Sequence, residues 1–153
     1  MYAVVTAIAL TSMQVLRTLP ERYNEVDVVP CPGRCATAYG AASFRRIVDA
    51  LASEGETLAL ARVLVVGVAD KAGDTHVQES SAVEVINGMR DAGASVSFID
   101  DLVGSITVRG GRMASVHAGD PSEWDAVLVH TLHPGVDHAW LSAARRVLFA
   151  AEC

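Results

Sequence analysis

The spacing of apolar residues predicts an alternation of strands and helices from residue 62 onward. Apolar runs at 63–68, 126–129 and 147–150 are typical of parallel strands covered on both faces, and 96–99 is expected to form a further strand. After the first of these runs, serines suited to cap a helix precede apolar residues at helical spacing, and Gly93 ends that pattern. A strand, a helix and a second strand in close succession form a right-handed βαβ unit.

Three further elements complete the predicted fold. A helix is expected over 41–60 with a stop at Gly55, a β-hairpin with a glycine turn over 105–116, and a last helix over 138–146. The predicted fold class is therefore α/β: an open, mainly parallel, Rossmann-like sheet with helices on both faces, a short β-hairpin and an N-terminal helical or irregular segment.

The first sixteen residues form an uncharged, mostly apolar segment. They are fewer than the roughly 20 residues of a membrane span, and no basic residues precede them as in a secretory signal. Apolar side chains would cover almost the whole circumference of such a helix, so we expect burial on more than one side. We divide the chain into an N-terminal segment, 1–40, with a candidate dimer contact, and a Rossmann-like domain, 41–153.

The charge balance excludes several classes of partner. The sequence has 12 Lys and Arg against 18 Asp and Glu, a net charge of −6, and its basic residues cluster only in pairs. A nucleic-acid-binding protein needs a basic face to displace counterions from phosphates. We expect a cytoplasmic protein that binds neither nucleic acid nor membrane.

The three cysteines do not form a recognisable metal site. Cys31 and Cys35 flank a Pro-Gly loop and Cys153 stands alone, whereas zinc sites draw four ligands at tighter spacing. We expect reduced thiols and no metal, while a pairing of Cys31 with Cys35 across the loop stays open.

Polar residues gather where the predicted strands end. In open α/β sheets the ligand crevice lies beyond the carboxyl ends of the strands, which here are 67–71, 100–101 and 131–133. The long connection 69–79 lacks the glycines of a dinucleotide fingerprint, since Ala69 and Ala72 occupy their places. Its one cation, Lys71, suits a phosphate as a point charge, or is a solvated surface lysine.

Three motifs carry a resemblance to a known family. Residues 62–81 resemble a strand followed by G-x-A-[FY]-K, an acidic stretch and V-R-E-S-P. Residues 93–100 resemble G-A-x-V-x-x-x-D-P, and 125–134 resemble D-A-[VI]-x-[VIL]-x-T-x-H. In this order they are similar to the nucleotide-sugar-binding C-terminal domain of the UDP-glucose/GDP-mannose dehydrogenases.

The resemblance implies a ligand and a set of binding residues. In complete enzymes of the family this domain closes over the nucleotide sugar, beside an NAD-binding Rossmann domain and a helical dimerisation segment. The family oxidises the sugar in two NAD-dependent steps through a catalytic cysteine. By resemblance, substrate contacts or the bracing of the crevice fall to Lys71, Glu79, Ser80, Asp100, Thr131 and His133.

Departures from the family pattern argue against catalysis by this chain on its own. Gln78 replaces an arginine that can bind an anion with two hydrogen bonds, and Asp70 replaces an aromatic residue. No G-x-C-x-P-K-D catalytic segment exists, so we assign no catalytic residue, and no cofactor to this chain alone, NAD being the cofactor of the family.

Three functional hypotheses remain open. The first is a stand-alone nucleotide-sugar-binding domain that is non-catalytic by itself, alone or as a homodimer. The second is a subunit that completes a dehydrogenase with a separate NAD-binding chain. The third is a structural or regulatory interaction module without a working pocket.

Overall fold

The computed structural model describes residues 36–78, 80–117 and 119–150. The predictions for residues 1–35, including Cys31 and Cys35, and for Cys153 lie outside the described residues. In the part that is described, no helix has the length and apolar character needed to cross a membrane.

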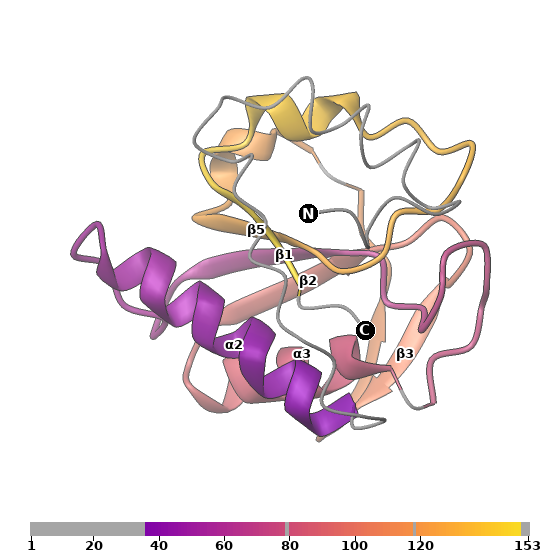
Figure 1. Cartoon of the computed structure of the whole chain (residues 1–153), viewed down its shortest axis with the longest axis horizontal. Coiled ribbons are helices and arrows are strands. Elements are labelled where there is room, and N and C mark those ends of the chain that lie inside the picture. Colours follow the sequence, from indigo (N-terminus) through magenta and orange to yellow (C-terminus); the bar gives the residue numbers. More distant parts are fainter. Residues whose placement is uncertain (1–35, 79, 118, 151–153) are drawn as a thin grey trace.

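Four parallel strands form the main sheet of the described residues. They are β1 (Arg62–Val66), β2 (Ser95–Ile99), β5 (Ala126–Val129) and β6 (Val147–Phe149), in the order β2-β1-β5-β6. The predicted fold class is confirmed: the domain is an α/β, Rossmann-like fold around a parallel sheet (Figure 1).

Two α-helices cover one face of this sheet. They are α2 (Ala36–Ala52) and α3 (Ser81–Asp91), which pack against each other and bury apolar side chains over the central strands. The largest contributions come from Ile47 and Leu51 of α2 and from Ile86 and Met89 of α3, all fully buried. α3 begins at Ser80, whose hydroxyl accepts a hydrogen bond from the Ala82 amide at 3.2 Å as an N-cap does.

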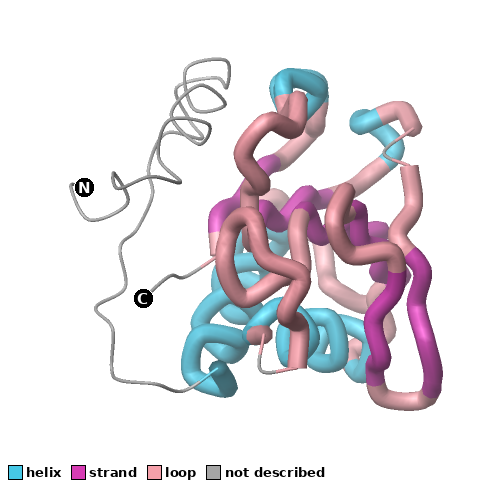
Figure 2. The backbone as a smooth tube through the Cα atoms, turned by 90° about the vertical axis from the view of Figure 1, so that its right-hand side faces the viewer, coloured by secondary structure: helices cyan, strands magenta, loops and turns pink. Residues whose placement is uncertain are grey.

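Among the described residues, two 3-10 turns cover the opposite face (Figure 2). They are η2 (Pro121–Glu123) and η3 (Ala139–Ala143), and Trp124 and Leu141 pack with Leu64 and Val127 on this face. The predicted helix over 138–146 is therefore wrong in type and extent. Its last residue, Arg146, is already extended beside β5, because its carbonyl accepts from the Val127 amide, so a longer helix would remove this pairing.

The predicted hairpin is confirmed as β3 (Ser105–Val108) and β4 (Gly111–Ala114), paired antiparallel. It lies against α3, where Arg109 donates its amide to the Asn87 side chain at 2.8 Å. The hairpin lies apart from the main sheet, and the carboxyl ends of β1, β2 and β5 stay together at one edge.

Candidate functional site

The carboxyl ends of β1 and β5 touch at Gly67. This residue has φ +76°, and a Cβ added to it would lie 1.9 Å from the Thr131 carbonyl oxygen. Only glycine combines this left-handed conformation with so close an approach of two backbones. Gly67 therefore sets how near the strand ends come to each other.

Asp100, at the end of β2, is the centre of a buried hydrogen-bond network. One carboxylate oxygen accepts from the Val68 amide at 2.9 Å, and the other accepts from the amides of Leu102 at 2.8 Å and Val103 at 3.0 Å. Burial alone would raise the pKa of the carboxyl, but the hydrogen bonds from Val68 and His133 outweigh it and hold the pKa below its usual value. Asp100 is thus an ionised acceptor for backbone donors.

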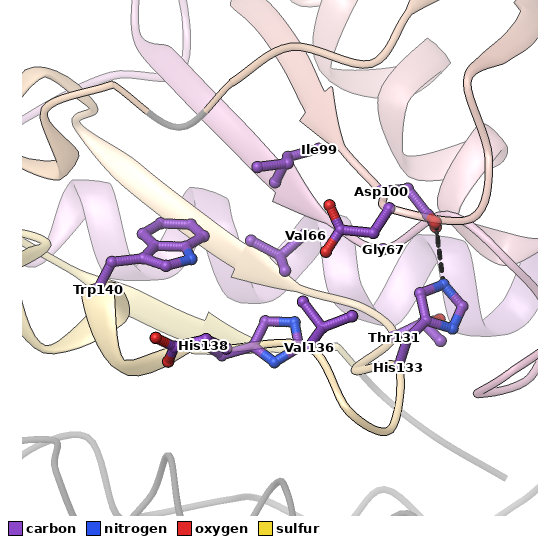
Figure 3. A pocket seen from close by; sticks show the side chains of 11 residues that line it. Val66, Gly67, Ile99, Asp100, Thr131, His133, Val136, His138 and Trp140 are labelled. Carbon is purple, nitrogen blue, oxygen red and sulfur yellow. Dashed lines mark hydrogen bonds and ion pairs between the residues drawn. The ribbon is translucent and has the colours of Figure 1, made fainter.

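His133 joins this network to the 69–79 loop. Its Nδ1 accepts from the Gly73 amide at 2.9 Å, so its proton lies on Nε2, which donates to Asp100 at 3.0 Å. The dashed line in Figure 3 marks the His133–Asp100 contact. Because both ring nitrogens are engaged, His133 acts as a brace that fixes the loop to the ends of β2 and β5.

A second chain of hydrogen bonds fixes Thr131. Its hydroxyl donates to the Ala69 carbonyl at 2.7 Å and therefore accepts from His130 Nδ1 at 2.8 Å. His130 Nε2 in turn accepts from the Ser81 hydroxyl at 2.7 Å. This chain joins the start of α3 to the end of β5. The sequence singled out neither His130 nor its contact with Ser81, because nothing in the pattern distinguishes a histidine one residue before the recognised Thr-x-His.

The partly buried ring of His130 makes the stability of the protein dependent on pH. Burial lowers its pKa to about 4 from 6.5, against an opposing effect of Asp70. The unfolded chain therefore binds more protons between these values, and stability falls as pH falls through this range. We expect a loss of about 2 kcal/mol between pH 7 and pH 5 in urea unfolding. His138, whose pKa burial also lowers, contributes in the same direction.

Two variants isolate this effect. His130→Gln is expected to flatten the slope of unfolding free energy against pH, whereas His117→Gln, at an exposed histidine, keeps the slope of the wild type. An unchanged slope in His130→Gln would contradict the assignment.

The residues expected from the sequence to bind substrate lie at different places in the structure. Asp100, Thr131 and His133 come together, with their polar groups bound to the protein itself. Ser80 is buried and caps α3, and Lys71 is exposed on the loop. Glu79 lies outside the described residues.

A pocket of about 130 Å³ opens at this edge of the sheet. Val66 and Gly67 at the end of β1 and Ile99 at the end of β2 contribute to its lining, together with Asp100, Thr131 and His133 (Figure 3). The remaining wall comes from Asp101 and from the segment 136–140, which the sequence analysis did not single out. A helix was expected from residue 138, whereas the structure has irregular backbone over 136–138 and the 3-10 turn η3 from Ala139.

The segment 136–140 supplies the unpaired polar atom of the pocket. His138 is only 6% exposed, and among the described residues its Nδ1 has no hydrogen-bond partner. Burial lowers the pKa of His138 despite the nearby Asp101 carboxylate, so the ring is neutral at pH 7. None of the described residues that line the pocket is a lysine or an arginine. In the same described ranges, no group of three or more His, Cys, Asp or Glu is placed to hold a metal ion.

Comparison with known proteins identifies a fold and no closer relationship. No protein-family model matches the chain, and no curated protein matches it. Among solved structures, it resembles the UDP-D-ManNAc dehydrogenase of Pyrococcus horikoshii with a TM-score of 0.55 and 19% identity. The match covers 76% of this chain and 27% of that one. The described domain therefore has the fold of a part of a UDP-sugar dehydrogenase.

Proposed function

We propose that the chain is a nucleotide-sugar-binding domain that has no dehydrogenase activity by itself. The observation that carries the proposal is the brace Gly73–His133–Asp100, which anchors the loop of Lys71 beside the pocket at the carboxyl edge. In open α/β sheets ligands bind at this edge. A phosphate would meet Lys71, the only lysine of the sequence, while the uncharged parts of the ligand would lie toward the pocket.

The hydrogen bonds that Asp100 and His133 make within the protein support a binding role over a catalytic one. A general base needs a nitrogen or oxygen that is available to accept the reacting proton. Asp100 accepts from three backbone amides and His133, and His133 has both nitrogens engaged. Asp100 and His133 therefore position the crevice, and neither is available as a general base.

A second candidate is a subunit of a split nucleotide-sugar dehydrogenase. It is favoured by the likeness to 27% of a UDP-D-ManNAc dehydrogenase, and in this candidate a separate chain supplies the part of such an enzyme that lies outside the match. NAD would then be bound by that partner. Copurification of a Rossmann-domain chain, with NAD reduction by the complex only, is the result expected of this candidate.

Thermal unfolding with single ligands tests the proposal. UDP, UDP-glucose, GDP-mannose and NAD are added separately to the wild type. A nucleotide sugar at a hundred times its dissociation constant is expected to stabilise by about 2.7 kcal/mol, which raises the Tm by several degrees. Lys71→Ala is expected to lose most of this rise because the phosphate loses its cation.

Arg90→Ala is the matched control. Arg90 is an exposed cation in the last turn of α3, at the opposite end of the helix from Ser81, so its loss should leave the rise unchanged. The absence of a rise with every nucleotide would overturn the proposal and favour an interaction module. An equal response of Arg90→Ala and Lys71→Ala would show a general charge effect instead of a site.

A further inference from the structure

His138 contributes to the pocket a buried polar atom that forms no hydrogen bond with the described residues. Asp100, Thr131 and His133 line the same pocket, but their hydrogen-bonding groups are occupied by the protein. His138 Nδ1 is buried and without a partner among the described residues. Buried polar atoms in folded proteins are nearly always paired, and an exception calls for an explanation, of which a bound ligand is one. This atom is where a ligand gains a hydrogen bond that no described residue supplies.

The other walls of the pocket define the shape and polarity of that ligand. Val66, Ile99 and Val136 provide apolar surface, and the Trp140 indole contributes an aromatic part of the lining (Figure 3). Asp101 and Asp137 also contribute to the lining, and both are exposed. A ligand with an apolar face and hydroxyl donors at its edge would satisfy both kinds of wall.

The charges of the lining argue against an ionic ligand. Three carboxylates contribute to the lining and no described cation does, so a phosphate would be repelled. A cation is not required either, because Asp100 is compensated by its amide donors and His133, and the two other carboxylates are exposed to solvent. A hydroxyl both donates and accepts, so it pairs with His138 Nδ1 in either tautomer.

We propose that this pocket binds a neutral, hydroxylated ring, with His138 Nδ1 as its hydrogen-bond partner and Trp140 against its apolar face. The assignment deepens the proposed function and rests on it, since the ring is the sugar or ribose of the nucleotide sugar. The phosphates stay outside, at Lys71.

Nuclear magnetic resonance can observe the two parts of the site separately. Reductive methylation with ¹³C-formaldehyde labels Lys71, the only lysine, together with the terminal amine. Ring ¹⁵N signals report the hydrogen bonding of His138, and the indole signal reports Trp140. The probes are UDP-glucose, inorganic pyrophosphate, uridine and methyl α-D-glucopyranoside.

The expected pattern is a division between the probes. UDP-glucose shifts the signals of Lys71, His138 and Trp140, and pyrophosphate shifts Lys71 alone. At least one of the uncharged probes, uridine or the glucoside, shifts His138 and Trp140 without Lys71. His138→Phe is expected to lower the affinity for that uncharged probe about tenfold, which is the effect of losing one hydrogen bond to a buried group. His117→Phe, at an exposed histidine outside the lining, should bind it as the wild type does.

Trp140→Leu keeps the inference testable if His138→Phe does not fold, because Trp140 is only partly buried. It should lower the affinity for the same probe, while pyrophosphate still shifts the Lys71 signal as in the wild type. Shifts of Lys71 by UDP-glucose with silent His138 and Trp140 signals would overturn the inference and leave the proposed function standing. Binding of an uncharged ring at His138 without any response to UDP-glucose would overturn the proposed function instead. Pyrophosphate acting on His138 would contradict the exclusion of phosphates from the pocket.

Discussion

Gly67→Ala is expected to destabilise the domain by about 4 kcal/mol or more, or to prevent its folding. The added Cβ would lie 1.9 Å from the Thr131 carbonyl oxygen and 2.7 Å from the carbonyl carbon. These are backbone atoms of the chain that follows β5, so they cannot move aside as a side-chain tip does. The left-handed φ of Gly67 adds a cost of about 1–2 kcal/mol for any residue with a side chain. The clash, which would push the ends of β1 and β5 apart, and the backbone strain at residue 67 therefore both lower the free energy of unfolding.

Gly73→Ala separates these two contributions. Gly73 has φ +77°, nearly the same as Gly67, but no atom lies within 4 Å of its added Cβ. This variant should lose only the conformational cost, about 1 kcal/mol. Urea unfolding followed by tryptophan fluorescence gives both values. Equal losses in the two variants would contradict the close approach of the β1 and β5 ends.

The regular elements of the fold were predictable because their signals are local. The apolar run at 126–129 became β5 with the same bounds, and the run at 63–68 became β1 with its last residues, Gly67 and Val68, passing into the loop. Ser80 acts as the helix cap that the sequence suggested. In each case neighbouring residues determine the conformation.

The segment 136–140 was not predictable in the same way. The spacing of residues 138–146 fits a helix, but the Arg146 carbonyl accepts from the Val127 amide just before β6, and the Arg146 side chain donates to the Asp125 carbonyl at 2.8 Å. These contacts join distant parts of the chain and override local preference. As a consequence the placing of His138 and Trp140 beside the pocket depends on tertiary structure, and no motif signals it.

The loop after β1 is held by hydrogen bonds within itself. The Asp70 amide donates to the His76 carbonyl at 2.9 Å, and the Asp74 carboxylate accepts from the amides of Thr75 and His76. The polar residues 70–76 thus close the loop on itself. Sequence reasoning located this loop and the histidine that anchors it. It did not show that His133 has both nitrogens engaged, because that follows from the position of the Gly73 amide.

Asp100→Ala is expected to destabilise the domain by about 3–5 kcal/mol. The change leaves the amides of Val68, Leu102 and Val103 without their acceptor and removes the partner of His133. Buried donors that lose an acceptor bear the full cost of desolvation. Asp101→Ala, at the neighbouring exposed carboxylate, should change the unfolding free energy by less than about 1 kcal/mol.

Asp100→Asn distinguishes lost charge from lost geometry. Each carboxylate oxygen faces at least one backbone donor, so the amide nitrogen of asparagine meets an N–H in either orientation. A loss close to that of alanine is therefore expected.

The pH dependence adds an independent check. The folded-state pKa of Asp100 lies below its usual 3.8, so the contribution of the carboxylate to stability is complete above that pH and is lost as pH falls through the folded value. The wild type should lose this contribution in acid and Asp100→Asn should not. Hydrogen exchange at the Gly73 amide should accelerate in both Asp100 variants, because His133 is no longer held. Slow exchange of Gly73 in Asp100→Ala would show that the loop is anchored by other contacts.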